Sequence, residues 1–176
     1  MVIKMEEKPQ FSNFLDNVDI FYKKFVTELH DYLNENKAKM TIKMAKNGYV
    51  VSYSHAGNKK VIFNYVFRKS GIIMRIYADN LNNYIDVIAS LPEKVLKKAL
   101  AAGDCKRLLD PTKCSSHCAM GYDFIIDNIR YKKCRFNCFM IPLNDENMPH
   151  LRQIIENEVS ERNNKTELML GGKSQI

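Results

Sequence analysis

The chain has 176 residues, of which 45% are hydrophobic and 27% are charged, and its formal net charge is +7 at pH 7. A chain of this length and apolar content can bury a core of its own, which excludes wholesale disorder and any need for stabilising disulfides. No run approaches the roughly 18 apolar residues of a membrane-spanning helix, so we expect no membrane segment.

The cysteine content and the N-terminus bear on the compartment. The chain has five cysteines, an odd number, and it is too long for a disulfide-stabilised miniprotein. Its first nine residues contain no apolar stretch like that of a secretory signal. We therefore expect a cytoplasmic protein whose thiols are free or bound to a metal. The excess of Lys, with 20 residues against 7 Arg, suggests an AT-rich, bacterial genome.

An amphipathic helix is predicted for residues 13–36, because apolar side chains recur there at helical spacing. Two predicted strands, at residues 40–46 and 49–54, flank Asn47-Gly48, a dipeptide that favours a tight hairpin turn. A pairing of Lys46 with Tyr49 would set the register of this hairpin.

A second predicted hairpin joins residues 61–67 to residues 72–78. Side chains alternate between the two faces of a strand, so the pattern places a large apolar set on a single face. That set includes Ile42, Val51, Phe63 and Met74. We expect this face to pack on the first helix.

The second half of the chain is predicted to contain helices and a third hairpin. Helices are predicted for residues 81–89 and 90–103, the latter with Ser90 as its N-cap. A hairpin follows at residues 122–133, and Pro149 opens the last helix.

The predicted fold is therefore an α+β domain in two layers, with a mainly antiparallel sheet of four or more strands packed on the N-terminal helix. Further helices and a C-terminal hairpin plus helix complete it. A single domain is expected to span residues 1–160, and the polar residues 161–176 are expected to form a disordered tail.

Positive charge is concentrated in one part of the chain. Residues 36–78 contain nine bases and no acid, whereas the rest of the chain has a net charge of −2. Such asymmetry indicates an anionic partner, either a small molecule or a nucleic-acid backbone. Lys residues that protect a sheet edge from aggregation would give the same pattern, so that interpretation stays open.

The candidate ligand-binding residues lie on the sheet face opposite the first helix. Strand alternation places five polar side chains there beside apolar ones: Lys43, Ser52, Asn64, Arg75 and Tyr77. A half-apolar face with a few polar groups is typical of a ligand cleft, and the Arg75 guanidinium suits a carboxylate or phosphate. The alternative is a face half-covered by a second layer, with Arg75 paired to an acid such as Asp86 or Glu93.

Four cysteines form two pairs, Cys114-x3-Cys118 and Cys134-x3-Cys138. Paired thiols at short spacing resemble a structural zinc site, with Cys105 or His117 as further candidate ligands. The alternation of apolar residues after Cys134 instead favours a strand, on which Cys134 and Cys138 would lie roughly 13 Å apart, too far for one zinc ion. Both interpretations stay open: a zinc site, or cysteines buried as ordinary core residues.

The segment from Cys114 to Phe139, CSSHCAMGYDFIIDNIRYKKCRFNCF, resembles a stretch of a family of small uncharacterised bacterial proteins. The resemblance covers 26 residues of the chain. It implies no known activity and assigns no functional residue.

Signatures of common enzyme classes are absent from the sequence, including the phosphate-binding loop, the dinucleotide-binding glycine motif and the serine hydrolase elbow. His30, on the first helix, and His55, in a turn, are expected at the surface. The sequence favours a non-enzymatic binding or regulatory domain with an anionic ligand on its basic sheet face. The alternatives are a small zinc-stabilised interaction module, a nucleic-acid-binding protein and an enzyme without recognisable motifs.

Overall fold

The structure, a computed structural model, describes residues 8–171. Its helices are α1 (Phe11–Asp16), α2 (Ile20–Glu35), α3 (Ile85–Ala89), α4 (Glu93–Leu100), α5 (Lys106–Leu109) and α6 (Met148–Gly171), with a short 3-10 turn, η1, at Leu81–Tyr84. Its strands are β1 (Lys39–Ala45), β2 (Gly48–Ser54), β3 (Val61–Arg68), β4 (Gly71–Ile76), β5 (Tyr122–Ile126), β6 (Ile129–Lys133) and β7 (Met140–Pro142).

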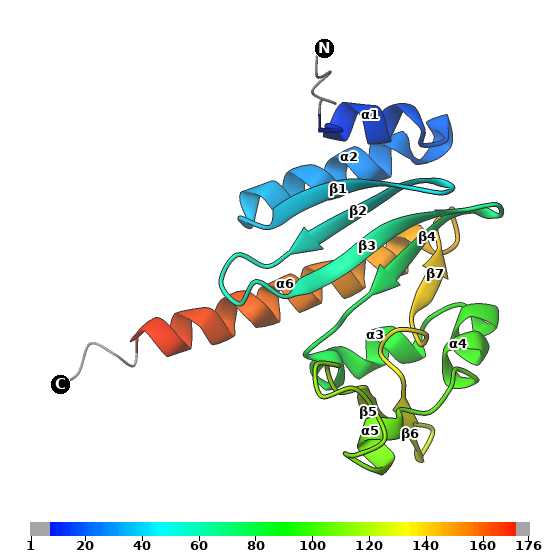
Figure 1. The fold of residues 1–176 in the computed structure, drawn as a ribbon, viewed down its shortest axis with the longest axis vertical. Coiled ribbons are helices and arrows are strands. Elements are labelled where there is room, and N and C mark those ends of the chain that lie inside the picture. Colours follow the sequence, from blue (N-terminus) through cyan, green and yellow to red (C-terminus); the bar gives the residue numbers. More distant parts are fainter. Residues whose placement is uncertain (1–7, 172–176) are drawn as a thin grey trace, which may run out of the picture.

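Five strands form an antiparallel sheet in the order β1-β2-β3-β4-β7, and β5 and β6 form a separate hairpin. Helices α2 and α6 lie side by side on one face of the five-stranded sheet, where Arg152 of α6 pairs with Glu28 of α2 (Figure 1). This arrangement confirms the expected α+β fold, with an antiparallel sheet packed on the N-terminal helix.

Between β4 and β7 the chain leaves the sheet and folds into an insert, defined here as residues 79–139 (Figure 1). The turn of its β5–β6 hairpin has positive φ at both Asp127 and Asn128, as tight hairpin turns require. The insert shares one buried cluster with the sheet, and the Tyr122 hydroxyl of the insert donates to the Ile76 carbonyl of β4 at 3.0 Å.

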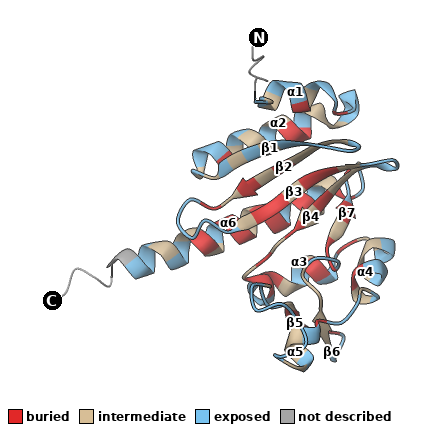
Figure 2. Cartoon of the chain, viewed as in Figure 1, coloured by how far each residue is buried: buried red, intermediate tan, exposed pale blue. Residues whose placement is uncertain are grey.

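The face of the sheet toward α2 and α6 forms the core. Ile42, Val51, Tyr65 and Met74 lie directly opposite one another across β1 to β4, and Phe63 lies two residues from Tyr65 on the same face. Val51, Phe63 and Met74 have no exposed surface. Figure 2 shows buried residues along β2, β3 and β4. The predicted common face is confirmed.

The first hairpin differs from its prediction by a shift of two residues. Its turn is centred on Lys46 and Asn47, and Ala45 pairs with Gly48. Gly48 has a φ of +128° and lies against the Phe67 ring, where an added Cβ would come within 3.0 Å of the ring. Because side chains alternate with a period of two, the shift leaves every side chain on its predicted face.

Two expectations about the helices were wrong. Helix α4 starts after Pro92, and the hydroxyl of Ser90 instead donates to the carbonyl of Val87 in α3. The first part of the expected disordered tail continues α6 as far as Gly171, because Arg162 is buried there among polar partners. Residues 172–176 lie outside the described part of the chain. Within residues 8–171, no helix combines the length and the apolar character needed to cross a bilayer.

The two histidines expected at the surface have tertiary partners instead. His55 is 3% exposed, and its Nε2 bonds with Asn163 Oδ1 at 2.9 Å. The Nδ1 atom of His30 bonds with the Tyr53 hydroxyl at 2.7 Å, and the His30 ring stacks on Phe11.

Candidate functional site

The sheet face away from α2 and α6 carries the polar residues that the sequence singled out. Ser52, Asn64 and Arg75 lie directly opposite one another on β2, β3 and β4. Thr41 and Met140 extend this row to the two edge strands. Ser52, Asn64 and Arg75 are half-buried, so other parts of the chain cover this face only in part.

A cavity of about 550 Å³ opens over this row, between the sheet and the insert. Ser52, Asn64 and Tyr77 line it on the sheet side, and two loops of the insert add Met120 and Phe136. The Phe136 ring lies edge-on to Tyr77, with 5.9 Å between ring centres. The volume and the mixture of apolar walls with a few polar groups are typical of a small-molecule site.

Three polar atoms in this region are buried without a hydrogen-bond partner among residues 8–171: Asn64 Oδ1, Arg75 Nε and Asp79 Oδ2, the last of which has only the longer ion pairs with Lys60 and Arg162. The Arg75 guanidinium makes one long hydrogen bond, 3.4 Å from Nη1 to the Tyr77 hydroxyl. Among the described residues Arg75 forms no salt bridge, and Glu93, an acid proposed to pair with it, bonds with Lys97. An unpaired buried donor beside an unpaired buried acceptor is costly within the fold.

The two cations that line the cavity, Lys60 and Arg135, are paired with Asp79. Arg135 Nη1 donates to Asp79 Oδ1 at 2.6 Å, and Lys60 Nζ lies 3.5 Å from Asp79 Oδ2. Burial by itself would raise the pKa of Asp79, but the Arg135 hydrogen bond and the charges of Arg162, Arg135 and Lys60 lower it below its ordinary value. Asp79 is therefore ionised at neutral pH, and its single negative charge is shared by Lys60 and Arg135, so positive charge is in excess at the cavity even before Arg75 is counted.

Lys43 does not line the cavity, and Arg75 borders it only through its neighbours Asn64 and Tyr77, which do. Lys43 is exposed on edge strand β1, opposite Val50, and three strand spacings, about 14 Å in all, separate it from the strand that carries Arg75. Lys46 lies in the turn at one end of the sheet and Lys59 in the loop at the other end. The acid-free segment therefore forms no single basic stripe, and Lys43 fits the protection of a sheet edge.

A buried ion pair beside the cavity was missed in the sequence. Arg162 and Glu158 of α6 are 2% and 0% exposed, and Arg162 Nε donates to Glu158 Oε1 at 2.7 Å. The guanidinium also donates to three backbone carbonyls, those of Lys60, Val61 and Tyr77. The only sequence signal was the i,i+4 spacing of an acid and a base, which also occurs on many exposed helices.

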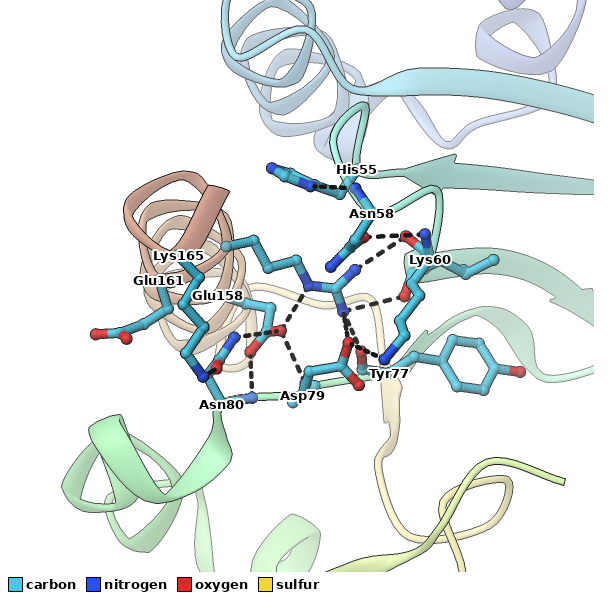
Figure 3. Close-up of polar contacts among 12 residues, drawn as sticks. His55, Asn58, Lys60, Tyr77, Asp79, Asn80, Glu158, Glu161 and Lys165 are labelled. Atoms are coloured by element: carbon cyan, nitrogen blue, oxygen red, sulfur yellow. Dashed lines mark hydrogen bonds and ion pairs between the residues drawn. The ribbon is translucent and has the colours of Figure 1, made fainter. Parts of the chain in front are cut away.

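Glu158 has enough donors around it to offset its burial. The backbone N–H groups of Asp79 and Asn80 donate to its carboxylate (Figure 3). The Tyr84 hydroxyl donates to it as well. The Arg162–Glu158 pair thus joins α6 to two parts of the chain, the start of β3 and the segment that leads from β4 into the insert. Both parts lie next to the cavity.

The chain turns after Cys134, contrary to the predicted strand. The backbone N–H groups of Asn137 and Cys138 both donate to the Cys134 carbonyl, and strand β7 starts only at Met140. Cys138 is 3% exposed, its thiol donates to the Ala99 carbonyl at 3.6 Å, and burial raises its pKa to about 12. Cys138 is thus a buried core residue.

The other four cysteines gather at one end of the insert. All five cysteines are free thiols. The pKa of the Cys118 thiol is raised by burial, by a hydrogen bond with Cys114 and by the nearby thiols of Cys134 and Cys105. In the part of the chain that the structure describes, no three Cys, His, Asp or Glu side chains are arranged to hold a metal ion as they stand.

Comparison with known protein families, with curated proteins and with solved structures finds no match. The resemblance of the segment from Cys114 to Phe139 to small bacterial proteins therefore stays a prediction, and function has to be inferred from the geometry of the site.

Proposed function

We propose that this protein is a non-enzymatic binding domain whose cavity takes a small organic anion with an apolar body. The observation that carries the proposal is the half-buried Arg75, which has no acidic partner among residues 8–171. Its Nε is unpaired, and its neighbours Asn64 and Tyr77 line an apolar cavity. A guanidinium with free donors in a partly desolvated place favours a carboxylate or a phosphate.

Two of the unpaired atoms narrow the chemistry of the ligand. Arg75 Nε is a donor and calls for an anionic acceptor, whereas Asn64 Oδ1 is an acceptor and calls for an O–H or N–H group. Because Asn64 and Arg75 are directly opposite residues on neighbouring strands, one ligand can reach both. The best-fitting class is an acid with a hydroxyl or amide next to its carboxylate.

The apolar walls account for the rest of the ligand. Val61, Met120, Phe136 and the Tyr77 ring surround the cavity, and its volume of about 550 Å³ suits a ring or a short alkyl chain. Phenyllactate combines an aromatic ring, a carboxylate and a neighbouring hydroxyl, so it serves as a test ligand.

Isothermal titration with phenyllactate, phenylacetate and phenylacetamide tests the proposal. We expect phenyllactate to bind best and the uncharged amide worst. Arg75→Gln should weaken phenyllactate binding by about tenfold to a hundredfold, the value of a hydrogen bond to a charged group. Lys43→Gln removes the same charge on the exposed edge strand, away from Asn64 and Tyr77, and it should change binding less than about twofold at physiological salt, where exposed charges are screened.

Two outcomes would contradict the proposal. If none of the acids binds and Arg75→Gln only lowers the free energy of unfolding, Arg75 has a structural role. If a labelled single-stranded DNA binds at low salt, and Lys43→Gln weakens it as much as Arg75→Gln does, the nucleic-acid alternative is favoured.

A further inference from the structure

Cys105 and Cys134 lie on neighbouring segments that pair in antiparallel fashion. The Cys105 N–H donates to the Lys132 carbonyl at 2.7 Å, and the Cys134 N–H donates to the Gly103 carbonyl at 2.9 Å. This register makes Cys105 and Cys134 diagonal neighbours on the same side of the pair, roughly 7–8 Å apart, from where their sulfurs can approach a common point.

Gly121, just before β5, brings a third segment against the first two. A Cβ at Gly121 would lie 2.7 Å from the Cys105 sulfur and 2.3 Å from the Lys133 carbonyl oxygen, so only a hydrogen atom fits there. Cys118 lies three residues before Gly121. The Arg107 guanidinium, in the helical turn that follows Cys105, donates to the Cys118 carbonyl and holds that loop beside Cys105.

The fourth thiol comes from the same loop. The Cys118 N–H donates to the Ser115 carbonyl at 3.0 Å, which turns the chain between Cys114 and Cys118. From these contacts we propose that Cys105, Cys114, Cys118 and Cys134 form a structural zinc site with four thiolate ligands. Zn²⁺ takes four sulfurs in a tetrahedron at about 2.3 Å, and soft thiolates select it over calcium or magnesium.

The thiols do not surround a metal as they stand, but a small rearrangement brings them together. Rotation of a cysteine from one staggered χ1 rotamer to the next moves its sulfur by about 3 Å. The backbone segments are already adjacent, so zinc binding requires side-chain rotation and local movement of the loop, with no change of topology.

The charge around the thiols suits the proposed site. A zinc ion with four thiolates carries net negative charge, which needs compensation in a partly buried place. Residues 105–135 contain seven bases and only three acids. The Arg107 guanidinium already donates to the carbonyls of Ser116 and Cys118, in the loop that carries Cys114 and Cys118.

Metal analysis of the full chain, purified under reducing conditions without chelator, tests the site. We expect one zinc ion per chain. X-ray absorption at the zinc edge should show four sulfur neighbours at about 2.3 Å, and this measurement on the wild type does not depend on any variant folding. Cys105→Ser should weaken zinc binding at least tenfold, whereas Cys138→Ala should leave the stoichiometry unchanged.

Three results would overturn the proposal. The first is a wild-type chain that holds no zinc and takes none up on titration under reducing conditions. The second is a first shell with fewer than four sulfurs. The third is a folded Cys138→Ala protein that has lost zinc, together with a Cys105→Ser protein that still binds it. This result would make Cys138, and not Cys105, the fourth ligand.

Discussion

Arg75 and Arg162 differ in how many acceptors surround each guanidinium. Arg162 donates to one carboxylate and to three backbone carbonyls, so its hydrogen-bonding capacity is used within the fold. Arg75 has one long bond to a hydroxyl and a buried Nε without a partner. The first arrangement stabilises the chain, and the second leaves donors available to a ligand.

Arg162→Gln should lower the free energy of unfolding by about 3–5 kcal/mol, because it leaves the Glu158 carboxylate buried without its cation. Arg130→Gln is the matched control: Arg130 also bonds with an acid, Asp123, but its side chain is 63% exposed. Its loss should cost at most about 1 kcal/mol. Urea unfolding of both variants measures the difference, and equal losses would argue against a buried structural pair.

The lowered pKa of Asp79 predicts a loss of stability in acid. A carboxyl group whose pKa is lower in the folded state stabilises the fold above its unfolded pKa, near 4, and loses this contribution as the pH falls through the folded pKa. We therefore expect wild type and Asp79→Asn to differ most in free energy of unfolding at neutral pH. The gap should narrow as the pH falls below about 4. If the difference in free energy of unfolding stayed constant with pH, the neighbouring cations would not stabilise the Asp79 carboxylate in the folded state.

At the scale of elements, the loop after Cys134 shows where local pattern fails. Alternating apolar residues predicted an extended strand, but Cys134 accepts two backbone bonds that turn the chain. The turn puts Phe136 at the cavity and buries Cys138, whose thiol donates to the Ala99 carbonyl. Alternation cannot distinguish a strand from a turn that happens to place its apolar residues in different environments.

Gly121→Ala should destabilise the insert, because an added Cβ would lie 2.3 Å from a backbone oxygen that cannot move aside without breaking the pairing of two segments. We expect a loss of about 1–3 kcal/mol, the usual cost of overpacking. Gly103→Ala adds the same atom in open space and should be close to neutral. Thermal unfolding of the two proteins compares them, and equal melting temperatures would contradict the tight approach of β5 to Cys105.

At the scale of the whole molecule, the insert and the sheet together make the cavity. The wall residues Met120 and Phe136 follow closely after Cys118 and Cys134, two of the proposed zinc ligands. Arg135 reinforces this wall by donating to the Met120 carbonyl at 2.9 Å and to Asp79. The thiol cluster is therefore placed to hold one side of the cavity in position.

Removal of zinc by a chelator should weaken phenyllactate binding and speed hydrogen exchange in residues 114–120 and 134–137, while the sheet keeps its protection. Exchange measured by mass spectrometry, together with titration of the same sample, reports the two effects separately. This link rests on the proposed function. Faster exchange with no change in phenyllactate binding would agree with the zinc site but contradict its coupling to the cavity. Phenyllactate binding that persists without zinc and still depends on Arg75 would support the ligand site independently of zinc.

The sequence by itself determined the helix–sheet layers, because burial of one apolar face requires a strict alternation that is visible residue by residue. It also placed Ser52, Asn64 and Arg75 on one face, and a two-residue error in the first hairpin did not disturb this. Only the tertiary structure decided which side chains meet. The Arg162 contacts span more than eighty residues of sequence, the cavity needs loops from the insert, and Cys105 reaches Cys134 through a pairing of segments about thirty residues apart. Such contacts depend on how the elements pack, and no local periodicity records them.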